Sequence, residues 1–101
     1  MDQTRELVLR AVSDDYECLQ QIIADVENWS TERGIACDRE IIVGALEGLI
    51  ADSHVKAYLL SSSPDGKAEA VNYTADRIID FWFYVTPNGK KLANTFRDKW
   101  R

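Results

Sequence analysis

The sequence predicts one α+β domain of 101 residues, with helices in its first half, two antiparallel strands after them and a helix at the end. Three patterns predict this class. Apolar residues recur at helical spacing in residues 14–33 and 38–52, alternate with a period of two in residues 55–60 and 78–85, and recur every four residues in residues 88–101. No linker or internal repeat divides the chain, so we expect residues 1–101 to form a single domain.

The charge is distributed unevenly along the chain. Residues 13–53 hold ten acidic residues against two arginines, a net of −8, whereas residues 86–101 hold five basic residues against one aspartate, a net of +4. The predicted helical half is therefore acidic, and the predicted C-terminal helix is basic.

The sequence also bears on the compartment. The first twelve residues carry four charges and lack the apolar run of a signal peptide, and no segment approaches the roughly 20 apolar residues of a membrane span. Cys18 and Cys37 lie far apart and outside any CxxC pattern, which favours free thiols in a reducing environment. We expect a cytoplasmic protein that does not contact a membrane.

The opening segment, residues 5–12, allows two interpretations. Leu7, Leu9 and Ala11 alternate with Val8, Arg10 and Val12, as they would in an edge strand. The same residues could equally form a short first helix.

Residues 14–33 are predicted to form a long helix. Asp14 can accept hydrogen bonds from the first turn while Glu17 reaches back, which is a capping box with an acid in place of the usual hydroxyl. Gly34 suits the left-handed position that ends such a helix. The face expected to be buried carries Tyr16, Leu19, Ile22, Ile23, Val26 and Trp29.

A second helix is predicted over residues 38–52, with Asp38 as its cap. Its buried face should carry Ile41, Ile42, Ala45, Leu46, Leu49 and Ile50. Its exposed face should carry Arg39, Glu40, Val43, Gly44, Glu47 and Gly48.

Two strands should follow. Val55, Ala57 and Leu59 are expected to face the helices in the first, and Ile79, Phe81, Phe83 and Val85 share one face of the second. The connection between them, residues 61–77, contains Ser-Pro-Asp-Gly, a turn signal, and is predicted to be a loop. The last helix, residues 88–101, would then carry one apolar stripe of Leu92, Phe96 and Trp100.

Two sequence segments, taken in their order along the chain, are similar to the second half of a winged helix-turn-helix domain. Residues 46–55 (LEGLIADSHV) resemble the end of a recognition helix and the strand after it, and residues 84–90 (YVTPNGK) resemble the passage from the wing into the C-terminal helix. His54 departs from the usual glycine or apolar residue, and a third helix before the wing would have to come from residues 4–12. The resemblance implies a winged helix, a helical bundle with a two- or three-stranded antiparallel β-wing.

The resemblance also implies a function. In the family, the helix at 38–52 would enter the major groove and the wing would lie along the DNA backbone. On this basis the candidate DNA-binding residues are the cations of the helix, the wing and the tail, namely Arg39, Lys67, Arg77, Lys90 and Lys91. Charge opposes this interpretation, because Asp38, Glu40, Glu47 and Asp52 face Arg39 alone in the helix, a net of −3, while phosphate contacts require cations.

A protein-binding surface is the alternative. Several large apolar side chains are predicted on the outer face of the strands, where they exceed the few hundred Å² that a monomer usually exposes. Either the C-terminal stripe or the N-terminal segment covers them, or a partner does, most simply a second copy. The candidate residues are Tyr58, Leu60, Trp82, Tyr84, Phe96 and Trp100.

Residues for catalysis are few. The single histidine, His54, has only Asp52 nearby in sequence, which falls short of a metal site, and it is expected to act at the end of a helix instead. Cys37 has no histidine base within sequence reach, and no GxSxG, P-loop or GxGxxG motif is present. The sequence predicts no enzyme, cofactor or metal, and leaves two functions open: a transcriptional regulator that binds double-stranded DNA, or a winged-helix module for protein contacts or homodimerisation.

Overall fold

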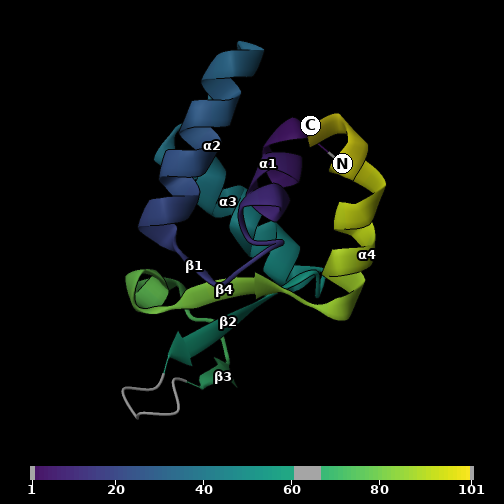
Figure 1. The fold of residues 1–101 in the computed structure, drawn as a ribbon. Coiled ribbons are helices and arrows are strands. Elements are labelled where there is room, and N and C mark those ends of the chain that lie inside the picture. Colours follow the sequence, from purple (N-terminus) through teal and green to yellow (C-terminus); the bar gives the residue numbers. More distant parts are fainter. Residues whose placement is uncertain (1, 61–66, 101) are drawn as a thin grey trace.

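A computed structural model describes residues 2–60 and 67–100, which form a layer of helices on one side of an antiparallel sheet (Figure 1). The sheet has four strands in the order β1-β4-β2-β3, one or two more than the sequence indicated. In chain order the elements are α1 (Gln3–Ala11), β1 (Glu17–Cys18), α2 (Leu19–Arg33), α3 (Arg39–Ala51), β2 (Val55–Leu60), β3 (Ala68–Val71), the 3-10 helix η1 (Ala75–Asp80), β4 (Trp82–Val85), α4 (Pro87–Phe96) and the 3-10 helix η2 (Arg97–Trp100). None of the helices described is long and apolar enough to cross a membrane.

The ambiguous opening segment is a helix. Asp2 caps α1 by accepting a hydrogen bond from the backbone N–H of Arg5 at 2.8 Å. Leu7, Val8 and Leu9 are all fully buried, because α1 packs against α2, α3 and α4 at once. Because Leu7, Val8 and Leu9 are consecutive and all buried, the helix shows no single apolar stripe over these residues, which is why its sequence also fitted a strand.

The sequence predicted that the long helix of residues 14–33 starts at residue 14, and this was wrong. Helix α2 begins at Leu19, its N-cap is Cys18 without a side-chain hydrogen bond, and Glu17 and Cys18 instead form β1 by pairing with Phe83 and Trp82 of β4. Asp14 and Glu17 therefore form no capping box, since backbone pairing with β4 takes this segment into the sheet. The predicted end was confirmed, because Gly34 has φ +70° at the C-cap.

Helix α3 lies where it was predicted, and Asp38 caps it by accepting a hydrogen bond from the N–H of Ile41 at 2.9 Å. Ile42, Ala45, Leu46 and Leu49 are buried, as expected. Two residues of α3 were predicted on the wrong face. Ile41 is 46% exposed, and Gly48 faces α1, not solvent.

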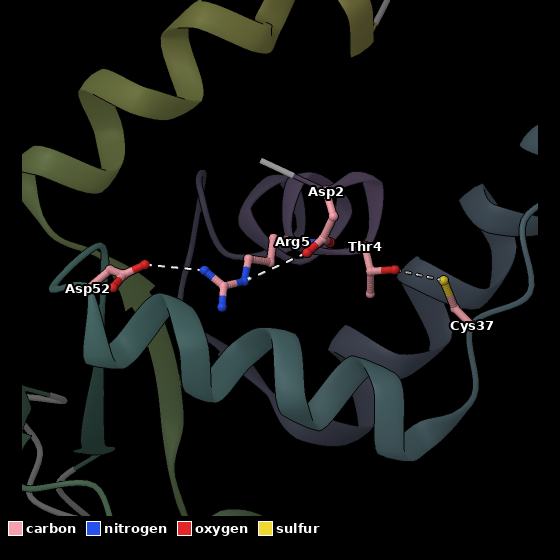
Figure 2. A network of polar contacts seen from close by, with 5 residues as sticks. All are labelled: Asp2, Thr4, Arg5, Cys37 and Asp52. Atoms are coloured by element: carbon pink, nitrogen blue, oxygen red, sulfur yellow. Dashed lines mark hydrogen bonds and ion pairs between the residues drawn. The ribbon is translucent and has the colours of Figure 1, made fainter.

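Gly48 allows Arg5 of α1 to lie directly across α3 (Figure 2). A Cβ at position 48 would overlap the Arg5 guanidinium, whose Nη1 bonds Asp52 Oδ2 at 3.2 Å and whose Nε lies 3.8 Å from Asp2 Oδ2. This glycine therefore serves helix packing, and it is not part of a surface that could face DNA.

The strand pattern was confirmed in part. Val55, Ala57, Phe81, Phe83 and Val85 are buried on the face that meets the helices. Residues 75–80, however, form η1 instead of extending the last strand, so that Ile79 is 71% exposed. Strand β3 was not predicted at all, and the Ser-Pro-Asp-Gly turn at residues 63–66 lies outside the described residues.

The Thr-Pro-Asn-Gly tetrapeptide joins α4 to the turn between α3 and β2. Thr86 Oγ1 donates to the carbonyl of Ser53 at 2.6 Å and accepts from the N–H of Gly89 at 3.0 Å, while the Thr86 N–H donates to the carbonyl of His54 at 2.9 Å. Gly89 packs so tightly on His54 that a Cβ would overlap the His54 carbonyl oxygen. Pro87 occupies the first helical position, where its missing N–H costs nothing.

Candidate nucleic-acid and protein interface

The order of the sheet forces the chain to cross over the strand β2. Strands β3 and β4 pair with opposite sides of β2, so residues 72–80, the crossover segment, must pass across that strand to connect them. The aromatic ring of Tyr73 lies on the helix side of the sheet, 5.9 Å from the ring of Phe81 and 6.2 Å from that of Phe83. The crossover segment therefore runs beside the outward face of α3, which is the face that would read DNA in a winged helix.

A hydrogen bond fixes the crossover segment to α3. The Tyr73 hydroxyl donates to Glu47 Oε2 at 2.8 Å. Burial raises the pKa of Tyr73 most, and the hydrogen bond and the negative charge of Glu47 raise it further, so the hydroxyl keeps its proton and remains a donor. Ala75 and Ile78 line the same hollow as Arg39, Val43 and Glu47.

The candidate DNA-binding cations do not gather in one place. Arg39 is the exposed first residue of α3, and Arg77 in η1 is tied to Asp80 by an ion pair of 3.4 Å. Lys90 and Lys91 are exposed on α4, which follows the opposite end of β4 from η1 (Figure 1). Lys67 is exposed just before β3.

The outer sheet face brings together four of the six candidate partner residues. Tyr58 is opposite Trp82 in the pairing of β2 with β4, and Tyr84 and Leu60 lie on the same two strands. Tyr16, which the sequence placed on the helix, covers part of this face, with its ring 5.0 Å from that of Tyr58 and 4.9 Å from that of Tyr84. Burial and these two neighbouring tyrosines raise the pKa of Tyr58.

A residue of the same chain, Tyr16, therefore covers part of this face. Tyr16 belongs neither to the C-terminal stripe nor to the N-terminal segment, the two covers that the sequence suggested. Leu60 remains 40% exposed at the edge of this outer face. Tyr58, Trp82 and Tyr84 are half-buried.

Phe96 and Trp100 belong to a different surface. Their rings stack at 6.3 Å, and the indole N–H of Trp100 donates to Glu6 Oε1 of α1 at 3.2 Å. Glu6 is only 4% exposed and also has Arg33 at 3.8 Å and Lys99 at 3.7 Å, so it ties η2 to α1 and α2. Glu6 directly precedes the apolar residues 7–9, and nothing in that pattern indicated that it would be buried or would pair with Arg33 and Lys99.

Neither His54 nor Cys37 is part of a larger reactive cluster in the described residues. The backbone N–H of His54 donates to the carbonyl of Leu49, and its buried Nδ1 has no hydrogen-bond partner among residues 2–60 and 67–100. Cys37 Sγ lies 3.4 Å from Thr4 Oγ1 (Figure 2). Within those same ranges, no group of three His, Cys, Asp or Glu side chains is placed to hold a metal ion.

Comparison with known proteins identifies the fold. A solved structure of a PadR family transcription regulator from Clostridium difficile superposes with a TM-score of 0.62, covering 99% of this chain and 88% of that one at 15% identity. The chain has the winged-helix fold. No protein-family model matches the sequence, and no curated protein is similar to it.

Proposed function

We propose that this chain is a non-enzymatic winged-helix binding module with a regulatory role, and that it acts by contacting protein instead of reading double-stranded DNA. The hydrogen bond from Tyr73 to Glu47 carries the proposal, because it holds the crossover segment against Glu47 on the outward face of α3. A recognition helix needs that face free to reach base edges.

Charge supports the same conclusion. Asp38, Glu40, Glu47 and Asp52 stand against Arg39 over residues 38–52, a net of −3. Phosphate neutralisation by lysine and arginine provides essentially all non-specific affinity for DNA, so this helix would repel a duplex.

The winged-helix fold favours DNA binding as a second candidate function. The similar structure is that of a transcription regulator, and Lys90 and Lys91 are exposed on α4 without an ion pair among the residues that the structure describes. A duplex would then meet the α4 end of the molecule, with α3 turned away from the groove.

Fluorescence anisotropy of a labelled mixed-sequence duplex distinguishes the two functions. At about 50 mM salt we expect no saturable binding, because the acidic surface repels the phosphates. Binding at that salt that falls steeply by about 200 mM, and that is lost when Lys90→Glu and Lys91→Glu are combined, would refute the proposal and establish DNA contact through α4.

A further inference from the structure

Two hollows lie side by side at the N-terminal end of α3, and they share Arg39. One, of about 340 Å³, separates α3 from the crossover segment and contains Val43 and Ile78. The other, of about 520 Å³, lies between η1 and the start of α2 and contains Ile23 and Ile79. We call this continuous surface the η1 surface.

Ile79 is the most exposed large apolar side chain of the described residues, at 71%. Single exposed apolar residues are ordinary on a protein surface. Ile79 is distinguished by its place beside a hollow that already has Leu19 and Ile23 in its wall. An apolar side chain from outside would therefore contact apolar atoms on more than one side.

Acidic residues outnumber basic ones on the segments of α3 and η1 that line the two hollows. Residues 38–47 and 75–80 hold five acids, Asp38, Glu40, Glu47, Asp76 and Asp80, against Arg39 and Arg77, a net of −3. Of these, Arg39, Glu40 and Glu47 line the hollows themselves. Asp80 forms an ion pair with Arg77, and Glu47 accepts a hydrogen bond from Tyr73. Glu40 and Asp76 are exposed and have no ion pair within residues 2–60 and 67–100.

Three further acids, Asp15, Glu17 and Asp25, lie around the start of α2. Burial raises the pKa of Glu17, and the nearby charges of Asp25 and Asp15 raise it further. None of these three acids lines the hollow, whose wall on this side is formed by Cys18, Leu19, Gln20 and Ile23.

We infer that the η1 surface docks a cationic segment of a partner protein, one in which lysine or arginine side chains flank an apolar residue. The apolar residue would cover Ile79, and the cations would meet Glu40 and Asp76, so that each half of the surface gains a partner of matching chemistry. The inference rests on the proposed function, because it names the chemistry of the protein partner.

The test uses the chain of residues 1–101 and a fluorescein-labelled amphipathic peptide built from leucine and lysine at helical spacing. A peptide with glutamate in place of every lysine reports on purely apolar binding. Ile79→Ser removes the apolar contact, and Glu40→Lys reverses a charge on the surface. Glu32→Lys makes the same change in net charge on an exposed position near the end of α2, away from the hollows, and is the matched control.

We expect the lysine peptide to bind in about 0.1 M salt and the glutamate peptide not to bind. Ile79→Ser and Glu40→Lys should each weaken binding at least about tenfold, whereas Glu32→Lys should change it by less than about twofold. Circular dichroism should show an unchanged fold in all three variants, since each substituted side chain is exposed.

Other outcomes would overturn the inference. If the lysine peptide does not bind, or if Glu32→Lys weakens it as much as Glu40→Lys, the η1 surface has no such role. Concentration-dependent assembly of the protein that Ile79→Ser abolishes would identify a second copy as the occupant. Duplex DNA that displaces the peptide would overturn the proposed function too, whereas a failure with the peptide alone leaves that function standing.

Discussion

Replacing Gly89 with alanine should destabilise the fold, although alanine is the better helix former. The added Cβ would overlap the carbonyl oxygen of His54 and lie 2.8 Å from its carbonyl carbon and 3.2 Å from its Cα, all of which are backbone atoms that cannot rotate away. The start of α4 must therefore move away from the turn between α3 and β2.

The cost follows from the hydrogen bonds at that contact. Separation stretches the bond from Thr86 N–H to the His54 carbonyl and the bond from Thr86 Oγ1 to the Ser53 carbonyl, at a residue that is only 7% exposed. Each such bond contributes roughly 0.5–1.5 kcal/mol net, and leaving a buried group unsatisfied costs more. After a small gain in helix propensity, we expect a loss of about 2–3 kcal/mol.

Gly44→Ala is the matched control. Gly44 lies in the interior of α3, and a Cβ there would meet no atom within 4 Å. The same substitution should stabilise the protein by about 0.5–1 kcal/mol, because alanine loses less backbone freedom than glycine. Replacement by alanine should thus lower the free energy of unfolding at position 89 and raise it at position 44.

Urea unfolding followed by far-UV circular dichroism measures both effects. For a domain of this size, about 1 kcal/mol shifts the melting temperature by roughly 4–8 °C, so the two variants should separate clearly. Thr86→Val should also destabilise, and the double variant with Gly89→Ala should lose less than the sum of the two, because both act on one contact. Gly89→Ala as stable as the unmodified protein would refute the close approach of α4 to His54.

Three further predictions concern the crossover segment, the acidic cluster and the outer sheet face. Tyr73→Phe should lower stability by about 1 kcal/mol in urea unfolding, since Glu47 loses its donor, and an unchanged midpoint would contradict that contact. Because the folded protein raises the pKa of Glu17, its stability contribution is present below its usual pKa of 4.5 and is lost as the pH rises. Glu17→Gln should therefore raise the melting temperature at pH 7 but not at pH 3, and an equal effect at both values would contradict the raised pKa. Trp82→Ala should reduce any dimer detected by light scattering while the fold persists, and unfolding instead would assign Trp82 to the core.

Local signals were sufficient where a residue acts on its own neighbours. Asp38 caps α3 and Gly34 ends α2, and both functions require only residues within one turn. The Thr-Pro-Asn-Gly phrase predicted the passage into the last helix for the same reason. Its glycine, however, turned out to be required by a backbone carbonyl more than thirty residues earlier in the chain.

Local signals failed where a distant segment competed with them. Asp14 and Glu17 have the spacing of a capping box, but β4 pairs with Glu17 and Cys18 and takes the segment into the sheet. The alternation of residues 5–12 did not indicate a strand, because α1 packs against α2, α3 and α4 and apolar residues on more than one of its faces are buried. In both cases the deciding partner is far away in sequence, where neither periodicity nor propensity can detect it.

The sequence by itself determined the α+β class, the position of α3, the buried face of β2 and the acidic character of the helix that would read DNA, since these depend on residue type and short-range spacing. Only the tertiary structure decided that β3 and β4 lie on opposite sides of β2, which sends residues 72–80 past α3 and brings Tyr73 to Glu47. Strand order is a choice among pairings of similar local quality, and it is settled by which arrangement buries Phe81 and Phe83 beneath the helices.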